Sequence, residues 1–180
     1  MSFPRSPEQL LPRQGGITLL EALAVLAIMG ILLAMALPSM RAFVIQNRLA
    51  AESRLLIAAL TLARSEAVKR GRAVKVCRSS TADAGGARCS AAASGDRDGA
   101  DWAAGWLVLE ADNGQILLRQ GALGADTQAP ASRATITYHA GGDAGSSYTN
   151  VEFSHKGEFA RMVCVAGSGR IRLKSDGSKC

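Results

Sequence analysis

Three basic residues alternate with two aliphatic residues near the end of the sequence. Arg170, Arg172 and Lys174 are separated by Ile171 and Leu173. Because the side chains of a strand point alternately to its two faces, this spacing predicts a strand that buries both aliphatics and displays three cations. Cations about 6.6 Å apart repel one another and suit a polyanion bound through its phosphates. The alternative interpretation is a solvated edge strand whose charges discourage aggregation.

Positive charge is concentrated in two segments of the chain. Residues 41–78 carry nine basic and two acidic side chains, a net charge of +7, and residues 161–180 carry five basic and one acidic, a net charge of +4. Residues 79–160 carry five basic and ten acidic side chains, a net charge of −5. A polyanion is therefore expected to meet the chain at these basic segments.

Other residues are candidates to extend the basic row. Lys179 lies in the same segment, and Arg161 and Lys156 precede it. Tyr138 and Tyr148 have rings that can stack on bases, but packing in the core or in a loop is the expected role for both.

A single carboxylate interrupts a long apolar segment. Residues 17–37 form a 21-residue stretch whose only charge is Glu21. As a helix this stretch would span roughly 30 Å, the thickness of a bilayer core. The small residues Gly15 and Gly16 come before the apolar stretch, whereas a secretory signal places its cleavage site after it. Cleavage at this glycine pair would remove the leader that precedes it and keep the helix as an anchor.

Four cysteines are present, and none has the spacing of a zinc site: Cys77, Cys89, Cys164 and Cys180. An even number in a membrane-tethered domain favours two disulfides formed in an oxidising compartment. Of the three possible pairings, we expect Cys77–Cys89 and Cys164–Cys180, each closing a local loop. Four unpaired buried thiols are the alternative.

Catalytic and metal sites are not expected. Residues 96–101 resemble a calcium loop, but the third acid before the glycine and the later glutamate are absent. His139 and His155 have no partner set for catalysis or metal binding, and no phosphate-binding Gly-Lys-Ser/Thr loop occurs. We therefore expect no enzyme, no cofactor and no metal.

The elements that position these residues follow from periodicity. Residues 38–71 repeat apolar positions every three to four residues, which predicts an amphipathic continuation of the apolar helix. Pro38 would kink or interrupt it, and Gly71 would end it. From residue 72 the period changes to two, with a strong hairpin turn at residues 112–114. Residues 102–111 are predicted to contain a strand, and further strands are predicted at these ranges: 74–76, 116–119, 135–138, 150–154, 162–165 and 170–174. The fold class is α+β, a long N-terminal helix followed by a small antiparallel β-rich domain at residues 72–180.

The N-terminal pattern resembles the processing site of type IV pilins and pseudopilins. The segment from Gly16 to Glu21 carries the resemblance, together with Pro38. In that family a prepilin peptidase cuts after the glycine and methylates the new amino terminus, which implies cleavage between Gly16 and Ile17. Glu21 and Pro38 then match the family's glutamate and proline, while Ile17 replaces the usual phenylalanine. A carboxylate in lipid normally needs a partner, and a neighbouring subunit's amino terminus would supply one for Glu21. A protonated Glu21 without a role is the alternative.

The rest of the chain resembles the GspH/FimT branch of this superfamily. The resemblance lies in residues 102–108, the turn at residues 113–114, and Phe153 followed by Gly157. The segment at residues 169–172 also resembles the C-terminal G-R-x-R motif of FimT-type minor pilins, which bind DNA for natural transformation.

This resemblance implies a minor pilin near the tip of a type IV pilus. Residues Arg170, Arg172, Lys174 and Lys179 would contact double-stranded DNA. The alternative is a GspH-like minor pseudopilin of a type II secretion system, with a purely structural role. Expected partners are other pilin or pseudopilin subunits, the prepilin peptidase and the bacterial inner membrane. The globular domain would lie in the periplasm.

Overall fold

The computed structural model describes residues 16–90 and 101–180, without the side chains of residues 36–38. The chain divides after Arg41 into two compact units. Helix α1 (Leu19–Arg70) contributes to both. By length and composition, its apolar portion is sufficient to cross a membrane.

Both ends of α1 are capped by local hydrogen bonds. The backbone N–H of Glu21 donates to the hydroxyl of Thr18 at 3.2 Å, as expected when Thr precedes a helix and Glu lies three residues on. At the other end Gly71 adopts φ +62°, and the N–H of Arg72 donates to the carbonyl of Ala67 at 3.2 Å. The predicted end of the helix at Gly71 is therefore confirmed. The helix continues past position 38 without interruption, and the side chain of Pro38 lies outside the described residues.

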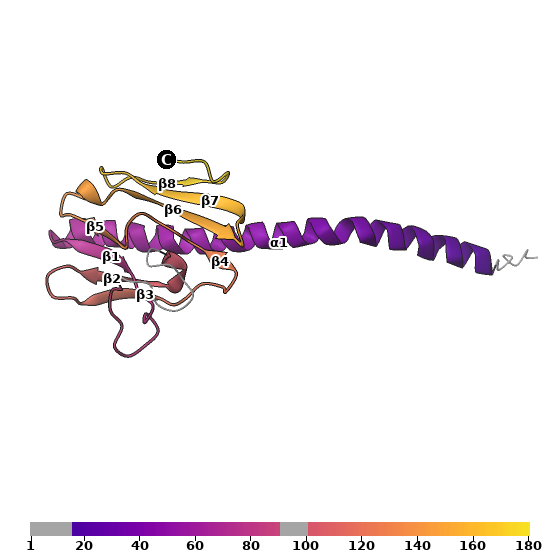
Figure 1. The fold of residues 1–180 in the computed structure, drawn as a ribbon, viewed down its shortest axis with the longest axis horizontal. Coiled ribbons are helices and arrows are strands. Elements are labelled where there is room, and N and C mark those ends of the chain that lie inside the picture. Colours follow the sequence, from indigo (N-terminus) through magenta and orange to yellow (C-terminus); the bar gives the residue numbers. More distant parts are fainter. Residues whose placement is uncertain (1–15, 91–100) are drawn as a thin grey trace, which may run out of the picture. The chain divides into compact units, whose positions relative to one another are not determined.

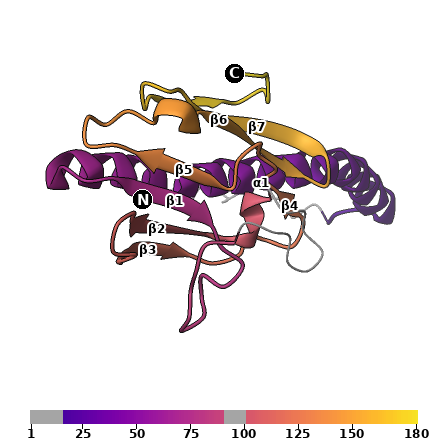
Figure 2. The same ribbon diagram turned by 60° about the vertical axis from the view of Figure 1, so that its left-hand side comes forward.

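Two antiparallel sheets of four strands each follow the helix (Figures 1 and 2). In spatial order, the first sheet comprises β3 (Ile116–Gln120), β2 (Trp106–Glu110), β1 (Val74–Arg78) and β5 (Thr135–Tyr138). The second comprises β4 (Thr127–Gln128), β6 (Thr149–His155), β7 (Glu158–Val165) and β8 (Ile171–Lys174). Two short 3-10 helices, η1 (Trp102–Ala104) and η2 (Gly145–Ser147), lie in the connections.

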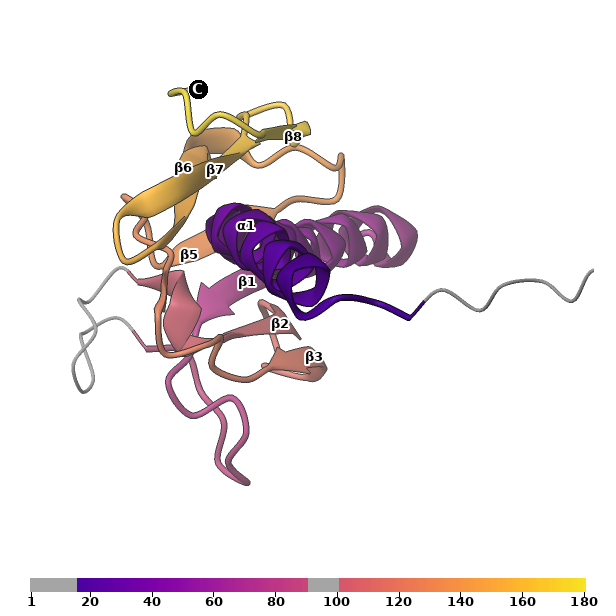
Figure 3. The ribbon, with the colours of Figure 1, turned by 90° about the vertical axis from the view of Figure 1, so that its right-hand side faces the viewer.

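One hydrophobic core joins the helix to both sheets in the second unit. Leu56 and Leu60 of α1 are fully buried in this core. Trp106 packs into it from the first sheet, and Phe153 and Val163 pack into it from the second. Figure 3 shows this part of α1 with β6–β8 on one side and β1–β3 on the other. The second sheet therefore has an inner face on the core and an outer face that is free of α1.

Polar side chains reinforce the packing of α1. Glu52 is 7 % exposed, and its carboxylate accepts hydrogen bonds from the hydroxyl of Thr127 at 2.7 Å and from Nε of Arg48 at 3.3 Å. Nε of Arg64 donates to the carbonyl of Gly142 at 2.9 Å. A buried carboxylate is tolerated only when hydrogen bonds satisfy it in this way. The bond from Thr127 connects α1 to β4, and the bond from Arg64 connects α1 to the β5–η2 loop.

The predicted fold class is confirmed, and two local differences have physical causes. Residues 102–111, predicted to contain a strand, contain β2, and the residues before it form η1, because Oδ1 of Asp101 accepts from the N–H of Ala103 at 2.8 Å and caps the turn. The short strand β4 lies outside the ranges predicted as strands, where it pairs with the end of β6. Strand β7 begins at Glu158, four residues before the predicted start, because the β6–β7 hairpin extends its pairing toward the turn.

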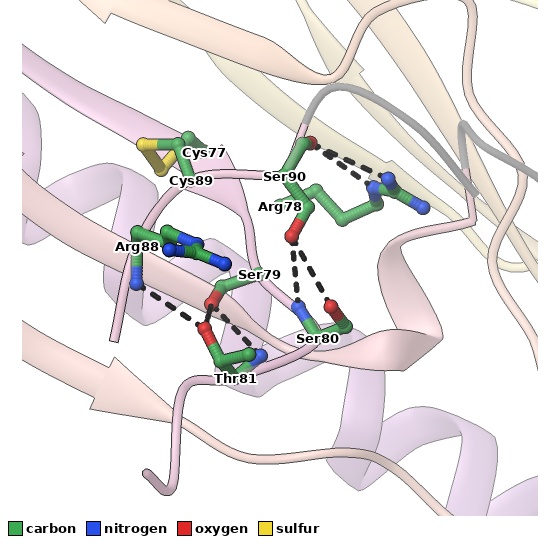
Figure 4. The surroundings of a disulfide bond; sticks show 8 residues. All are labelled: Cys77, Arg78, Ser79, Ser80, Thr81, Arg88, Cys89 and Ser90. Atoms are coloured by element: carbon green, nitrogen blue, oxygen red, sulfur yellow. Dashed lines mark hydrogen bonds between the residues drawn. A yellow bond between two sulfur atoms is a disulfide. The ribbon is translucent and has the colours of Figure 1, made fainter. Parts of the chain in front are cut away.

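Two disulfides close local loops. Cys77 bonds to Cys89, with their Cα atoms 5.5 Å apart, and Cys164 bonds to Cys180. Figure 4 shows the first, which holds the loop after β1 against the strand. In the same loop, the carbonyl of Ser90 accepts from the guanidinium of the buried Arg78 at 3.4 Å. These are the two pairs that were predicted from the sequence. Of the calcium-like segment at residues 96–101, residues 96–100 lie outside the described residues.

Candidate functional site

Arg172 and Lys174 of the basic row lie in β8, an edge strand of the second sheet, and Arg170 immediately precedes it. β8 pairs with β7 in a register that sets Cys164 opposite Arg172 and Met162 opposite Lys174. Arg170 and Arg172 are exposed, and Lys174 is half-buried. Registered neighbours lie on the same face of a sheet, so the cations share the outer face with these β7 residues.

The two aliphatics between the cations are less buried than predicted. Ile171 is half-buried and packs against the core, but Leu173 remains 37 % exposed. The prediction that both are buried is therefore wrong for Leu173. The reason is that β8 is a four-residue edge strand with a neighbour on one side only, so part of its inner face has nothing to cover it.

The segment after β8 turns back toward the same face. The disulfide Cys164–Cys180 connects it to β7, with the Cα atoms 5.9 Å apart. Nζ of Lys174 donates to the backbone carbonyl of Lys179. Figure 1 shows this segment running beside β8. The disulfide thus brings Lys179 to the cations of β8 although four residues separate it from the strand.

These elements surround a hollow of about 590 Å³, which we call the basic hollow. All four cations predicted to bind DNA line it: Arg170, Arg172, Lys174 and Lys179. Tyr148, Asn150 and Ser132 line it as well. The hollow therefore combines a cationic wall from β8 and the returning segment with an uncharged wall from the start of β6 and the loop before it.

The cations of the basic hollow are not neutralised within the part of the chain that the structure describes. None of the four forms an ion pair with a described carboxylate. Asp176 is nearby, and hydrogen bonds from the backbone and hydroxyl of Ser178 hold its pKa below the usual value, with a smaller contribution from Lys174. The register also sets Glu152 opposite Met162, the β7 neighbour of Lys174. Among the described residues, two acidic side chains therefore lie near four basic ones, and the net charge of these side chains is positive.

Two of the candidate extensions lie elsewhere. Arg161 is half-buried and lines a smaller hollow with Gln46. Nζ of Lys156 lies 3.1 Å from Oδ1 of Asp126, and this contact lowers the pKa of Asp126. Neither residue lines the basic hollow, so neither adds a charge to it.

The two tyrosines have different environments. Tyr138 is fully buried in the core, as expected, whereas Tyr148 is 62 % exposed and lines the basic hollow. Asn150 and Ser132 were not predicted as site residues. The alternation along β6 places Asn150 on the face opposite the buried Val151, whereas Ser132 lies in a loop and has no comparable sequence signal.

The residues of the predicted processing site lie in the first unit. Gly16 and Ile17 precede α1 and are exposed, and the side chain of Glu21 is exposed in its first turn. Across residues 16–90 and 101–180, no three His, Cys, Asp or Glu side chains lie close enough together to hold a metal ion.

Comparisons with known proteins identify the family. A family model described as type II transport protein GspH matches residues 52–169, and a model of the prokaryotic N-terminal methylation motif matches residues 11–37. A search of curated proteins found no match. The GspH match ends before β8, so it does not include the cations of the basic hollow.

Solved structures with the same fold include two crystal forms of the type IV minor pilin FimU from Pseudomonas aeruginosa. One is 21 % identical with a TM-score of 0.55, and the alignment covers 73 % of this chain and 92 % of FimU. The other is 20 % identical with a TM-score of 0.52, covering 72 % and 94 %. The likeness shows a shared pilin fold, a helix followed by antiparallel sheet.

The family is one of structural subunits, not of enzymes. The family model covers well over half of the chain, and the methylation motif precedes it at the start of the apolar helix. This chain belongs to the GspH family and is a minor pilin or pseudopilin, a subunit of a type IV pilus or of a type II secretion system.

Proposed function

We propose that this chain is a minor pilin of a type IV pilus, placed near the tip, that binds DNA through the basic hollow during natural transformation. One observation carries the proposal: Arg170, Arg172, Lys174 and Lys179 gather in a single hollow without ion pairs to described carboxylates. Clustered cations repel one another, and this cost is offset when phosphates replace their counterions.

The position of the cations supports a role in binding an outside partner. They lie on an edge strand, on the residue that precedes it and on a segment returned by a disulfide, not on the inner face that packs on α1. If these cations served to stabilise the fold, we would expect them to form ion pairs with acidic side chains of residues 79–160. Arg70 and Arg72 are used in this way, because they bond to Glu110 and Asp112.

We also propose the processing and location of the subunit. A prepilin peptidase would cut between Gly16 and Ile17 and methylate Ile17, which agrees with the match to the methylation motif. The apolar part of α1 would then anchor the subunit in the bacterial inner membrane, with the globular unit in the periplasm, where both disulfides form. In the assembled filament, Glu21 would pair with the amino terminus of a neighbouring subunit.

A second candidate function is a minor pseudopilin of a type II secretion system with a purely structural role. The description of the matching family model as a type II transport protein favours it. FimU, by its title a type IV minor pilin, has the same fold, so the fold is compatible with both machines. The two proposed functions differ in whether the basic hollow contacts DNA.

The test is a DNA titration of the full chain in a neutral detergent. The ligand is a short duplex closed at both ends by non-nucleotide linkers, and the titration is repeated at several salt concentrations. We expect affinity to fall with salt, and the double variant Arg170→Ala/Arg172→Ala to bind about tenfold more weakly or worse. The slope of log affinity against log salt should decrease by about two, because two phosphate contacts are lost.

The matched control removes two exposed positive charges from α1, in Arg54→Ala/Lys69→Ala. It lowers the net charge by the same amount, so an unchanged affinity would show that the effect is local. An equal loss of DNA affinity in both variants would show that the interaction is a general attraction between the net charges of the chain and the DNA. No binding by the folded wild-type chain would contradict the proposal and leave the structural role.

A further inference from the structure

The uncharged wall of the basic hollow carries an exposed aromatic ring. Tyr148 immediately precedes β6 and is 62 % exposed, whereas the other tyrosine, Tyr138, is fully buried. Single exposed apolar side chains are ordinary on protein surfaces. This ring differs because it lines the hollow that also holds Arg170 and Arg172. An aromatic face beside cations provides two kinds of contact in one site.

The position of Tyr148 is fixed by its neighbour Arg133. Nε of Arg133 donates to the backbone carbonyl of Tyr148 at 3.2 Å, and its guanidinium carbon lies 5.7 Å from the centroid of the tyrosine ring. The backbone of Arg133 is itself held, because its carbonyl accepts from the indole N–H of the buried Trp102 at 2.8 Å. The ring is thus connected to the core through one residue. A ring held in place before binding loses less conformational freedom when a ligand stacks on it.

Neutral polar groups lie between the ring and the cations. Asn150 is half-buried and faces Cys164, which in turn faces Arg172, so all three share the outer face of the sheet. The amide of Asn150 both donates and accepts hydrogen bonds, as the edge of a nucleobase does. The hydroxyls of Ser132 and Thr149 lie 3.0 Å apart on the same wall. The hollow therefore offers an aromatic face, an amide and cations, which match the base and the phosphate of a nucleotide.

The size and chemistry of the basic hollow favour unpaired over paired DNA. A volume of about 590 Å³ lies within the range of small-ligand sites. In a closed duplex the faces of the bases are stacked on one another, so an aromatic side chain reaches them only where a base is unpaired. Phosphates of a duplex remain open to Arg170 and Arg172, but the ring of Tyr148 would have nothing to stack on.

We infer that the basic hollow accommodates an unpaired nucleotide of a DNA strand, whose base stacks on Tyr148 while its flanking phosphates contact Arg170 and Arg172. The inference rests on the proposed DNA binding and makes it more specific. The subunit would hold a single-stranded segment or a frayed end more tightly than a closed duplex. Arg133 is then a positioning residue, since it acts through Tyr148.

The test uses the full chain in a neutral detergent with three ligands of equal charge. These are a single-stranded oligothymidine, a duplex closed at both ends by non-nucleotide linkers, and a polyglutamate peptide. The variant Tyr148→Leu keeps an apolar side chain and removes the ring. The matched control is Phe159→Leu, which removes an exposed aromatic ring from the same sheet outside the hollow. We expect Tyr148→Leu to weaken binding of the single strand by about 5- to 100-fold and to leave duplex binding unchanged.

A second readout reports the contact directly. An oligonucleotide carrying a photoreactive halogenated uracil is irradiated with the wild-type chain, and the linked peptide is identified by mass spectrometry. We expect the linkage at Tyr148. Duplex binding that depends on Arg170 and Arg172, with no preference for the single strand and no effect of Tyr148→Leu, would overturn this inference and keep the proposed function. Equal affinity for polyglutamate would also overturn it. Absence of all DNA binding would overturn both.

Discussion

The hydroxyl of Tyr138 is buried without a hydrogen-bond partner among the described residues. Burial raises the pKa of this hydroxyl to about 12, from 10.0 in an unfolded chain. The folded state therefore keeps the proton when the unfolded state loses it. The stability that depends on the neutral hydroxyl is complete below pH 10 and is lost as the pH rises toward 12.

We predict that Tyr138→Phe increases the free energy of unfolding by about 1 kcal/mol at neutral pH, because an unsatisfied buried hydroxyl is removed. The difference between variant and wild type should widen above pH 10, since phenylalanine does not ionise. Denaturant unfolding of the full chain in detergent at several pH values measures both effects. Tyr148→Phe is the control, because its ring is exposed and its hydroxyl is not buried. A destabilised Tyr138→Phe would reveal a hydrogen bond to that hydroxyl.

The roles of individual residues were only partly predictable. The alternation from Arg170 to Lys174 was sufficient to predict the cationic row, because a strand period is local information. The different environments of Tyr138 and Tyr148 depend on which face of which sheet packs on α1, and this is decided by contacts between distant segments. Lys179 was predicted from charge alone, and the disulfide explains how it reaches the hollow.

The turn between β7 and β8 sets the position of Arg170. Gly169 in this turn adopts φ +79°, and a Cβ atom there would lie 2.0 Å from the carbonyl oxygen of Gly142. That carbonyl also accepts the hydrogen bond from Arg64 of α1. The turn is therefore packed against the helix and the β5–η2 loop at a point where only glycine fits.

We predict that Gly169→Ala destabilises the chain by several kcal/mol, because backbone strain is added to a clash with a backbone atom that cannot rotate away. Gly114→Ala is the matched control: its φ is +71°, but no atom lies within 4 Å of the added methyl group. It should cost only about 1 kcal/mol of strain. Thermal unfolding of both variants gives the comparison. Equal effects would show that the positive φ alone, and not the clash, requires glycine.

Element positions were well predicted where the signals are local. The end of α1 at Gly71 and the hairpin at Gly114 follow from turn chemistry that acts within a few residues. Strand β4 was not predicted, because two residues carry no period and this strand exists only through pairing with β6. The arrangement into two sheets was not predictable from periodicity either, since it depends on pairings such as β1 with β5 that join residues far apart in sequence.

At the scale of the whole subunit, the proposed processing at Gly16 decides whether the chain is released from its leader. We predict that Gly16→Val prevents removal of residues 1–16 and methylation of Ile17, because a branched side chain would obstruct the peptidase at the cleaved bond. Mass spectrometry of the chain from cells expressing a prepilin peptidase distinguishes the two forms.

Gly30→Val is the control for this prediction. Gly30 lies in the same apolar segment, and its added Cβ atom would meet nothing within 4 Å. It should be processed like the wild type. Processing of Gly16→Val at the same bond would contradict the assignment of the site.

The position of β5 next to β1 has a consequence for the order in which the subunit folds. β1 pairs with β5 across some 60 residues, Val74 with Tyr138 and Cys77 with Thr135. Local contacts form faster than distant ones, because closing a long loop costs more entropy.

Both disulfides span short separations, of 12 and 16 residues. In the proposed topology the apolar part of α1 stays in the membrane and the rest of the chain emerges in sequence order, so the Cys77–Cys89 loop is complete early. The first sheet, in contrast, stays open on one edge until residue 138 has emerged. Until then the apolar stripe of α1 lacks part of its cover, and we expect the unfinished subunit to be most prone to aggregation during this interval.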